Sequence, residues 1–315
     1  MSDKLAGKKL SVIVPVCERV NSTVELYSEY HTYLLSIVGD IEFIYVISDE
    51  HREIAKSLLK LKATDPHLTV LILNRNYGEA TALQAGFEKS SGDYILKLPP
   101  YRQIETESLY KLFEFVDDYD LVLAKRWPRL DGKANQSQTR LFNILLNRLS
   151  GHHFNDMGCA VRLMKRKVLE EINLYGNQHR FIPLLAYQLG FRFCEVDLPQ
   201  AQDDTFTRLY RPQHYLSRVL DLLTIIFLTQ FNRKPLRFFG AFGAGSIFIG
   251  SVGLIYLAYE RLMLDVALAD RPILVMFALF FVMGIQLLGV GLVGETVIFT
   301  QSRNSKEYRI KEIIN

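Results

Sequence analysis

LSVIVPV, which occupies residues Leu10–Val16, is an almost unbroken run of β-branched and apolar residues. A run of this kind is typical of a strand that helices cover on both faces, because neither face then needs polar side chains. The preceding MSDKLAGKK has basic residues, but the apolar run is too short for a signal peptide. We therefore expect LSVIVPV to form the first strand of a buried, parallel sheet.

Further apolar runs follow this strand, and segments with helical periodicity separate them. Strands are expected at Ile41–Ile47, Leu68–Leu73, Tyr94–Leu98 and Asp120–Ala124, and helices at Ser22–Ile37, Arg52–Leu61, Gly78–Lys89 and Ile104–Phe115. This alternation with short connections predicts an α/β fold with a doubly wound, mostly parallel sheet. Ligands of such sheets bind beyond the carboxyl ends of the strands, where the strand order reverses. The candidate site loops are therefore those that follow Val16, Ile47, Leu98 and Ala124.

Two long apolar segments near the C-terminal end predict a transmembrane helical hairpin. Phe238–Tyr259 carries no charged side chain and is long enough, at about 1.5 Å per residue, to cross a hydrocarbon layer of about 30 Å. The second segment, Ile273–Phe299, follows Pro272 and is interrupted only by Gln286 and Glu295. Glycines recur in both segments, which suits close helix packing in lipid. The alternative of two buried helices in a soluble core is disfavoured, because neither segment has a polar face.

Basic residues flank the two segments on one side, which predicts that both ends of the chain are cytoplasmic. The flanking cations are Arg233, Lys234 and Arg237 before the first segment and Arg303, Lys306, Arg309 and Lys311 after the second. The connecting loop has Arg261 and Arg271 against Glu260, Asp265 and Asp270. Upstream, the apolar residues of His214–Lys234 recur on a helical period, which predicts an amphipathic helix in the membrane interface. An ordinary core helix is the alternative for that segment.

The composition limits the classes of function. The net charge of +3 over 315 residues is too small to indicate a nucleic-acid partner. Cys17, Cys159 and Cys194 lie far apart without metal-ligand or redox spacing, so we expect reduced thiols in a domain that faces the cytosol. The expected domains are an α/β domain at 1–212, an interfacial helix at 213–236, two transmembrane helices at 237–302 and a cytoplasmic tail at 303–315.

Several motifs carry a resemblance to a known family. In chain order they are SVIVPV, LNRNYGEATALQAGFEKSSGDYIL, AKRWPR, RLFNILLNRLSG, NDMGCAVRLMKRKVLEEI, QHRFIPLLAYQLGFRFCEVDLP and YLSRVLDLLT. Together they resemble the family 2 glycosyltransferases that move a sugar from a nucleotide donor onto a polyprenyl phosphate. These include dolichyl-phosphate mannose synthases and bacterial undecaprenyl-phosphate sugar transferases. The resemblance runs from about Leu10 to the C-terminus and implies a GT-A-like domain with a membrane hairpin.

The chain departs from this family at two acidic motifs. Family members end the second strand with Asp-Asp-Gly-Ser, where this chain has Ile47 and Ser48; Asp49 and Glu50 are the nearest acids. At the fourth strand the family has Asp-x-Asp, whose carboxylates hold a divalent cation against the diphosphate. The corresponding residues here are Pro99 and Tyr101. Mg²⁺ or Mn²⁺ is thus implied by the family, while its usual ligands are absent.

The resemblance also implies the site residues. The catalytic candidates are Asp156, as base or as orienter of the sugar, and Arg162, which would fix that acid or contact phosphate. A helix-capping turn residue and a structural ion pair are the respective alternatives. A guanidinium group can donate two hydrogen bonds to phosphate oxygens, so the candidates to bind the acceptor phosphate are Arg126, Arg129 and Arg140. The alternative is that they are solvated surface arginines. The donor-site candidates are Pro15, Glu18, Asp49, Arg75, Tyr101, Gln103, His179, Arg208, Arg211 and His214.

These features favour a membrane-anchored, inverting glycosyltransferase that uses a nucleotide sugar and a polyprenyl phosphate at the cytoplasmic leaflet. Lys97, Arg102, Arg208, Arg211 and His214 could supply positive charge to the diphosphate without a metal. The alternative is a non-catalytic relative that binds a lipid phosphate or acts as a scaffold, since fold does not imply function. A transporter is disfavoured because only two spans are expected. The hairpin could support homo-oligomers, but no motif specifies their number.

Overall fold

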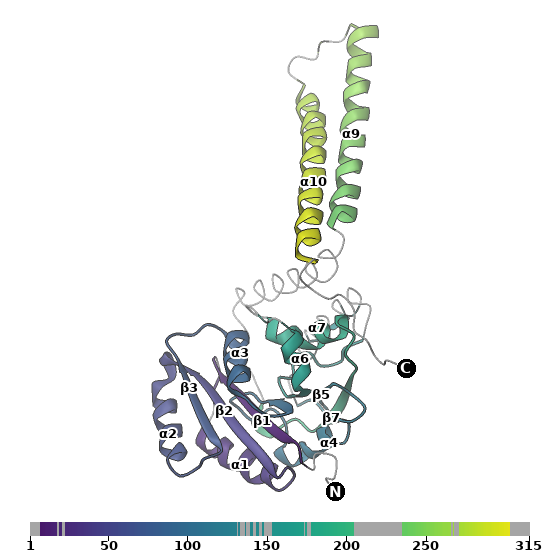
Figure 1. The fold of residues 1–315 in the computed structure, drawn as a ribbon. Coiled ribbons are helices and arrows are strands. Elements are labelled where there is room, and N and C mark those ends of the chain that lie inside the picture. Colours follow the sequence, from purple (N-terminus) through teal and green to yellow (C-terminus); the bar gives the residue numbers. More distant parts are fainter. Residues whose placement is uncertain are drawn as a thin grey trace, which may run out of the picture. The chain divides into compact units, whose positions relative to one another are not determined.

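The computed structural model describes residues 7–204 and 235–302 of the chain, apart from 18, 21–22, 131, 133–135, 137–138, 141–142, 145–146, 148–152, 173, 175–177, 266 and 268–270. The chain divides into two compact units, Met1–Leu222 and Leu223–Asn315. The first unit is an α/β domain and the second contains a helical hairpin (Figure 1). The predicted interfacial helix His214–Lys234 lies outside the described residues.

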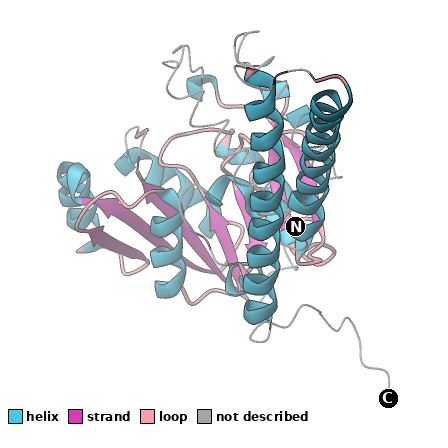
Figure 2. Cartoon of the chain, turned by 90° about the horizontal axis from the view of Figure 1, so that it is seen from above, coloured by secondary structure: helices cyan, strands magenta, loops and turns pink. Residues whose placement is uncertain are grey.

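A seven-stranded sheet forms the centre of the α/β unit (Figure 2). Its strands are β1 (Lys9–Val16), β2 (Asp40–Ser48), β3 (Leu68–Leu73), β4 (Tyr94–Lys97), β5 (Leu121–Arg126), β6 (Arg162–Lys165) and β7 (Phe193–Leu198). The order is β3-β2-β1-β4-β6-β5-β7, and every strand except β6 runs in the same direction. This confirms the doubly wound, mostly parallel sheet. The strand order reverses at β1, which pairs with both β2 and β4.

Helices cover both faces of this sheet because both faces are apolar. In its described residues, the α/β unit has the regular helices α1 (Thr23–Leu35), α2 (Arg52–Lys62), α3 (Glu79–Lys89), α4 (Tyr110–Phe113), α6 (Arg166–Glu171) and α7 (Ile182–Gln188). Short 3₁₀ turns are η1 (Asp49–His51), η2 (Thr106–Ser108), η3 (Gln178–Phe181) and η4 (Gln202–Asp204). Val12, Val14, Phe43 and Tyr45 pack with α1 and α2 in the main core, whereas Ile44 and Val46 pack with α3 on the opposite face.

The close approach of α3 to the sheet depends on Gly86. A Cβ atom at this position would lie 2.6 Å from Cγ2 of Ile13 in β1 and 3.1 Å from Cγ2 of Val46 in β2. Both values are shorter than ordinary carbon contacts, so a larger residue would push the helix away from the sheet. This packing holds the N-terminal end of α3 beside the carboxyl ends of β1 and β4.

One predicted helix is shorter than expected. The segment Ile104–Phe115 forms only the turn η2 and the single-turn helix α4. Ile104 instead makes a β-bridge with Gln200, and the amide of Glu105 donates to the carbonyl of Pro199 at 3.0 Å. Tertiary pairing therefore takes the first residues of the segment away from a helix, although Leu112 and Phe113 are buried as the periodicity predicts.

Two long apolar helices form the second unit. They are α9 (Pro235–Met263) and α10 (Pro272–Ser302), and α10 begins at Pro272 as expected. Both are long and apolar enough to cross a membrane, and only 17% and 6% of their most apolar windows are buried. This exposure is opposite to that of core helices in a soluble protein. Glycines bring the helices together: a Cβ on Gly243 would lie 2.8 Å from the carbonyl oxygen of Gly284, and one on Gly250 would lie 2.6 Å from the amide nitrogen of Phe281.

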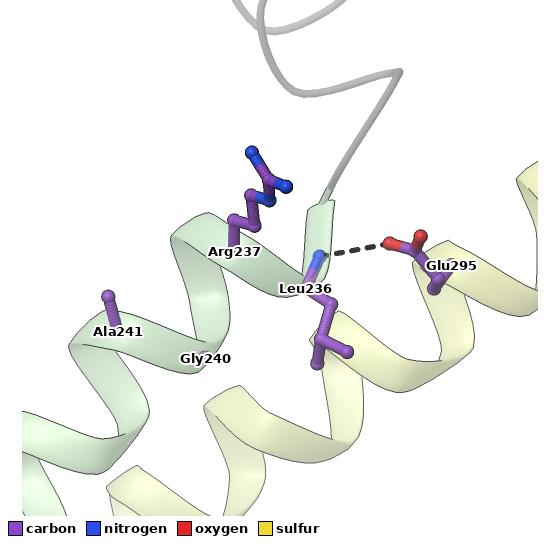
Figure 3. Close-up of a pocket in the computed structure, with 5 residues that line it drawn as sticks. All are labelled: Leu236, Arg237, Gly240, Ala241 and Glu295. Atoms are coloured by element: carbon purple, nitrogen blue, oxygen red, sulfur yellow. Dashed lines mark hydrogen bonds between the residues drawn. The ribbon is translucent and has the colours of Figure 1, made fainter.

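A single acidic side chain joins the helices near the N-terminal end of α9 (Figure 3). The carboxylate of Glu295 in α10 accepts a hydrogen bond from the amide of Leu236 at 3.4 Å. The first amides of a helix have no partner within the helix itself. Glu295 therefore satisfies an amide of α9 across the hairpin, beside a pocket of about 530 Å³ that Arg237, Gly240 and Ala241 also line.

Candidate functional site

The site lies at the carboxyl edge of the sheet, around the point where the strand order reverses. Chain segments leave β1, β4 and β5 at this edge, and the segment before β6 also reaches it because β6 runs in the opposite direction. The loop after β3 is tied to β1 by Asn76, whose side-chain amide donates to the carbonyl of Cys17 at 3.0 Å. Gly78 then starts α3 with φ of 88°, a conformation that favours glycine.

A buried ion pair between Arg126 and Asp156 forms the centre of the site. Nε of Arg126 lies 2.8 Å from Oδ2 of Asp156, and Nη2 lies 2.9 Å from Oδ1. The backbone amide of Arg126 also donates to Oδ2 at 3.2 Å. Burial by itself raises the pKa of the Asp156 carboxyl, but the hydrogen bonds and charge of Arg126, with a smaller contribution from Arg129, hold it below its usual value. Asp156 is therefore an oriented, ionised carboxylate.

Asparagine and glutamine side chains hold the loop that carries Asp156. Asn147 donates to the carbonyl of Phe154 at 3.0 Å and accepts from its amide at 2.8 Å, and Asn143 donates to the carbonyl of Asn155. From the other side, Oε1 of buried Gln103 accepts from the amide of Ala160 at 2.8 Å. The loop after β4 and the loop before β6 are thus joined through Gln103.

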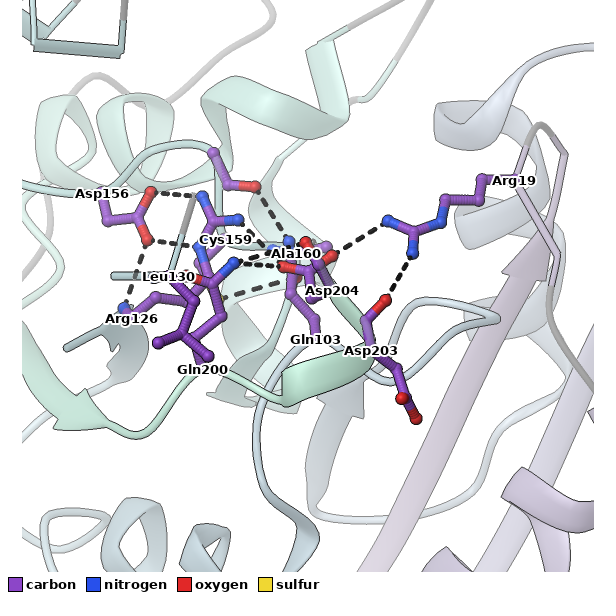
Figure 4. Close-up of polar contacts among 11 residues, drawn as sticks. Arg19, Gln103, Arg126, Leu130, Asp156, Cys159, Ala160, Gln200, Asp203 and Asp204 are labelled. Atoms are coloured by element: carbon purple, nitrogen blue, oxygen red, sulfur yellow. Dashed lines mark hydrogen bonds and ion pairs between the residues drawn. The ribbon is translucent and has the colours of Figure 1, made fainter. Parts of the chain in front are cut away.

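The ion pair continues into a chain of alternating charges (Figure 4). Nη1 of Arg126 lies 3.3 Å from Oδ2 of Asp204, and Oδ1 of Asp204 lies 2.9 Å from Nη1 of Arg19. Gln200 also donates to Oδ2 of Asp204 at 2.9 Å. Burial raises the pKa of the Asp204 carboxyl despite the two arginines and Gln200. The order along the chain of charges is Asp156, Arg126, Asp204 and Arg19.

Tyr101 lies at the end of this chain of charges. The guanidinium carbon of Arg19 lies 4.2 Å from the centroid of the Tyr101 ring, which is the distance of a cation–π contact. Arg19 follows β1 and Tyr101 follows β4, so the contact connects the two strands that meet where the order reverses.

A second buried cluster lies on the α3 face of the same edge. Nζ of Lys97 contacts Oε1 of Glu79 at 2.5 Å, and Nε2 of His179 lies 3.1 Å from Oε2 of the same carboxylate. Arg162, opposite Lys97 in the β4–β6 ladder, donates to the carbonyls of His179 and Arg180. Burial lowers the pKa of Lys97 and of His179, and lowers that of Arg162 to about 10. Burial opposes the ionisation of Glu79, but Lys97 and His179 hold the pKa of Glu79 well below its usual value.

The residues at this edge do not fit a divalent cation at the loop after β4. The two positions that would supply carboxylates are Pro99 and Tyr101, and the ring of Tyr101 makes a cation–π contact with the guanidinium of Arg19. Hard cations need oxygen ligands with negative charge. Asp156 and Asp204 are already paired with arginines. Within the described part of the chain, no group of three or more His, Cys, Asp or Glu side chains is arranged to hold a metal ion.

The structure brings six of the predicted site residues into or beside the charge clusters at this edge: Tyr101, Gln103, Arg126, Asp156, Arg162 and His179. Other predicted residues lie apart from the charge clusters. Pro15 is a buried β1 residue opposite Val46, Asp49 pairs with Arg52 at 2.5 Å, the guanidinium of Arg75 stacks on Tyr77, and Arg140 is exposed. Arg129 is half-buried and close enough to affect the pKa of Asp156. Glu18, Arg208, Arg211 and His214 lie outside the described residues.

Sequence analysis did not identify Arg19, Glu79 or Asp204. Arg19 follows β1, where the strand order reverses, and Asp204 follows β7 at the same edge of the sheet. Their positions after these strands could therefore have marked them as candidate site residues. Their pairing was not predictable, because it joins residues that are 185 positions apart. Glu79 lies within a quoted motif but had no assigned role.

The fold and the site define the GT-A-like class of glycosyltransferase domains, in which a doubly wound sheet presents polar residues at its carboxyl edge. Residues 11–173 match the model of glycosyl transferase family 2. The chain belongs to this family, and with two membrane-length helices it is a membrane-anchored glycosyltransferase. This confirms the sequence-based prediction of an enzyme.

Relatives match nearly the whole chain, hairpin included. The chain is 30% identical over 311 residues to an undecaprenyl-phosphate 4-deoxy-4-formamido-L-arabinose transferase of Pseudomonas aeruginosa (strain LESB58), covering 97% of this chain and 90% of the relative. It is 28% identical over 313 residues to the transferase of the same name from Yersinia pestis (strain Pestoides F), covering 98% and 94%. The predicted resemblance to polyprenyl-phosphate sugar transferases is therefore confirmed.

Solved structures agree with the fold. Glucosyl-3-phosphoglycerate synthase from Mycobacterium tuberculosis, in a crystal structure with Mg²⁺ and uridine diphosphate, matches with a TM-score of 0.51 and 16% identity. The match covers 72% of this chain and 80% of that chain. At this level of identity the likeness shows the fold alone.

Proposed function

We propose that this chain transfers a sugar from a nucleotide-sugar donor to undecaprenyl phosphate at the cytoplasmic face of a membrane, without a divalent cation. The observation that carries the proposal is the buried Arg126–Asp156 pair at the carboxyl edge of the sheet, in a family 2 domain whose chain also contains the hairpin. The names of the near full-length relatives support the acceptor.

The reaction that this site favours is a single displacement. An oxygen of the acceptor phosphate attacks the anomeric carbon while the bond from that carbon to the diphosphate oxygen breaks, and the electron pair leaves with the nucleoside diphosphate. A phosphate monoester is ionised near neutral pH, so the site needs alignment and positive charge more than a general base. Configuration at the anomeric carbon is inverted.

This mechanism makes Asp156 an orienting carboxylate. Both of its oxygens accept hydrogen bonds from Arg126, and its pKa is held below the usual value, so it is poorly suited to take a proton. Its negative charge can instead orient a sugar hydroxyl beside the anomeric carbon. Arg126 contacts Asp156 and Asp204, and the arginines proposed for the acceptor phosphate are half-buried Arg129 and exposed Arg140.

The transfer itself is the direct test. The full-length protein in lipid nanodiscs would be incubated with undecaprenyl phosphate and a panel of nucleotide sugars, with EDTA or with Mg²⁺, and the lipid product detected by mass spectrometry. We expect a glycosylated lipid phosphate with at least one donor in EDTA. No product with any donor would contradict the proposed function, whereas product only with Mg²⁺ would contradict its metal independence.

The proposed orientation places the α/β unit and both termini on the cytoplasmic side, because the flanking cations lie there. Lys56→Cys in the α/β unit and Ala267→Cys in the connecting loop provide exposed reporter positions. A membrane-impermeant maleimide added to right-side-out vesicles should label Ala267→Cys and leave Lys56→Cys unmodified. The reverse pattern would contradict the orientation.

A further inference from the structure

Arg19 and Tyr101 occupy the place in the fold where a ligand of a doubly wound sheet binds. They follow β1 and β4, the adjacent parallel strands at which the strand order reverses. Ligands of open α/β sheets bind in the crevice beyond the carboxyl ends of such strands. A ligand in this crevice would therefore meet the stacked guanidinium and phenol.

The guanidinium of Arg19 is fixed from several sides. Its Nη1 lies 2.9 Å from Oδ1 of Asp204, and its Nη2 donates to the carbonyl oxygen of Asp203 at 3.3 Å. Asp204 has 3% of its side chain exposed and is itself held by Arg126 and Gln200. The Arg19 side chain retains 28% exposure. It is thus an anchored cation that solvent can still reach.

The chemistry of this arrangement matches a diphosphate. Among Asp156, Arg126, Asp204 and Arg19, the side chain of Arg19 is the most exposed, so a ligand that arrives from solvent meets a positive charge. A planar guanidinium forks onto phosphate oxygens, and an aromatic ring beneath it fixes its plane. The ring belongs to Tyr101, one of the two positions at which the family resemblance implies a metal-binding carboxylate.

We propose that Arg19, in contact with the ring of Tyr101, binds the diphosphate of the nucleotide donor and supplies the positive charge that the family resemblance assigns to a divalent cation. This inference rests on the proposed function. As the bond between the anomeric carbon and the diphosphate oxygen breaks, the electron pair passes to the diphosphate, and a fixed cation stabilises the charge that develops there. Arg19 is then a substrate-binding residue with no proton to transfer.

The binding test uses the full-length protein in detergent micelles with EDTA present. UDP, GDP and ADP would each be titrated by calorimetry into the wild type, Arg19→Ala, Arg19→Lys and the control Arg192→Ala. Arg192 is an exposed arginine before β7, at the opposite edge of the sheet. We expect metal-free binding of at least one nucleotide by the wild type and the control. Arg19→Ala should weaken nucleotide binding by about tenfold or more. Arg19→Lys should restore only part of the affinity, because an ammonium cannot make the bidentate phosphate contact of a guanidinium and contacts an aromatic ring less well.

Two variants of Tyr101 test the stack separately. Tyr101→Phe keeps the ring and should change the dissociation constant by no more than about twofold, whereas Tyr101→Ala should weaken binding several-fold. Thermal unfolding of each variant would show that it is folded, and Arg19→Lys replaces Arg19→Ala if the latter is not. Unchanged binding in the Arg19 variants would overturn the proposal. So would wild-type protein that binds none of the nucleotides in EDTA or binds them only with Mg²⁺.

Sugar transfer measured on the same samples separates this inference from the proposed function. If nucleotide binding depends on Arg19 but no lipid product forms with any donor, the inference stands and the proposed function fails. If the lipid product forms in EDTA and Arg19→Ala keeps the wild-type rate, the proposed function stands and the inference fails.

Discussion

Lys97 and Arg162 lie directly opposite each other in the β4–β6 ladder, and both are almost completely buried. Among the described contacts, the carboxylate of Glu79 is the counter-charge of Lys97, while Arg162 is satisfied by backbone carbonyls. Two adjacent buried cations repel each other, and Glu79 offsets this repulsion. The stability of this edge of the sheet therefore depends on the carboxylate of Glu79.

Glu79→Gln should destabilise the α/β unit by about 3–5 kcal/mol, because it leaves a buried ammonium without its counter-charge. Adding Lys97→Met to this variant should recover most of the loss, since a buried ion pair replaced by apolar side chains costs little. Chemical denaturation of the three proteins would measure the difference. A double variant no more stable than Glu79→Gln would show that Glu79 does not act through Lys97.

Asp156→Asn should lower the rate of sugar transfer by about 100-fold or more, because the neutral amide loses the negative charge proposed to orient the sugar hydroxyl and the charge-assisted bonds from Arg126 that hold this side chain in place. Arg126→Lys should have an effect of similar size, since lysine cannot reproduce the fork. The double variant should be little worse than either single one, as for residues that act as a unit. Fully additive losses in the transfer assay would contradict a shared role.

Acid should weaken the fold through His179, whose Nε2 lies 3.1 Å from Glu79 and whose pKa is lowered by burial and by the charges of Lys97 and Arg180. Its pKa is lower in the folded protein than the value of about 6.5 in the unfolded chain. The unfolded chain thus takes up a proton first, so this contribution to stability is present above about pH 6.5 and is lost as the pH falls toward the folded-state pKa.

His179→Gln isolates this contribution. Thermal unfolding would be measured at pH 7.5 and pH 5.5, which lie on either side of about 6.5. The midpoint should fall further for the wild type than for the variant between these two pH values. Parallel curves for the two proteins would exclude a role of His179 in the acid sensitivity.

The hairpin should tolerate larger residues at some glycines and reject them at others. Gly250→Val and Gly284→Val place Cβ atoms within 2.6 Å of the facing helix, and overpacking of this kind costs about 1–3 kcal/mol. Gly245→Val and Gly289→Val are matched controls in the same helices, because a Cβ at either position meets no atom within 4 Å. Thermal midpoints in detergent should fall for the first pair only; equal effects in all four would contradict the packing.

Restoring acids to the loop after β4 should change the metal dependence. In the triple variant Arg19→Ala, Pro99→Asp, Tyr101→Asp, two carboxylates replace the stacked guanidinium. We expect nucleotide binding that requires Mg²⁺ or Mn²⁺, because these cations favour carboxylate ligands and bridge them to phosphates. Calorimetry with EDTA and with each metal would check this prediction. A nucleotide dissociation constant that is the same with and without the metal would contradict it.

Features of this protein that depend on a short stretch of sequence could be predicted, whereas contacts between distant segments could not. Strand β1 and helices α9 and α10 followed from continuous apolar runs, and Asp156, Gln103 and Arg162 were identified by motifs around them. Strand β6 was not predicted, because RLMK is short and charged at both ends. The contacts of Arg19 with Asp204 and of Lys97 with Glu79 depend on how distant segments meet, which no local pattern contains.

The reversed strand β6 has a consequence for how this sequence can change in length. Residues 153–161 are held by Asn143 and Asn147 at one end and by the β6 register at the other. Because side chains alternate between the two faces of a strand, one inserted residue passed into β6 would turn Arg162 to the opposite face and put an apolar side chain opposite Lys97. We therefore expect residues 153–161 to tolerate substitutions but not insertions or deletions, whereas the turn at Gly190, at the opposite edge, is not tied to the β6 register.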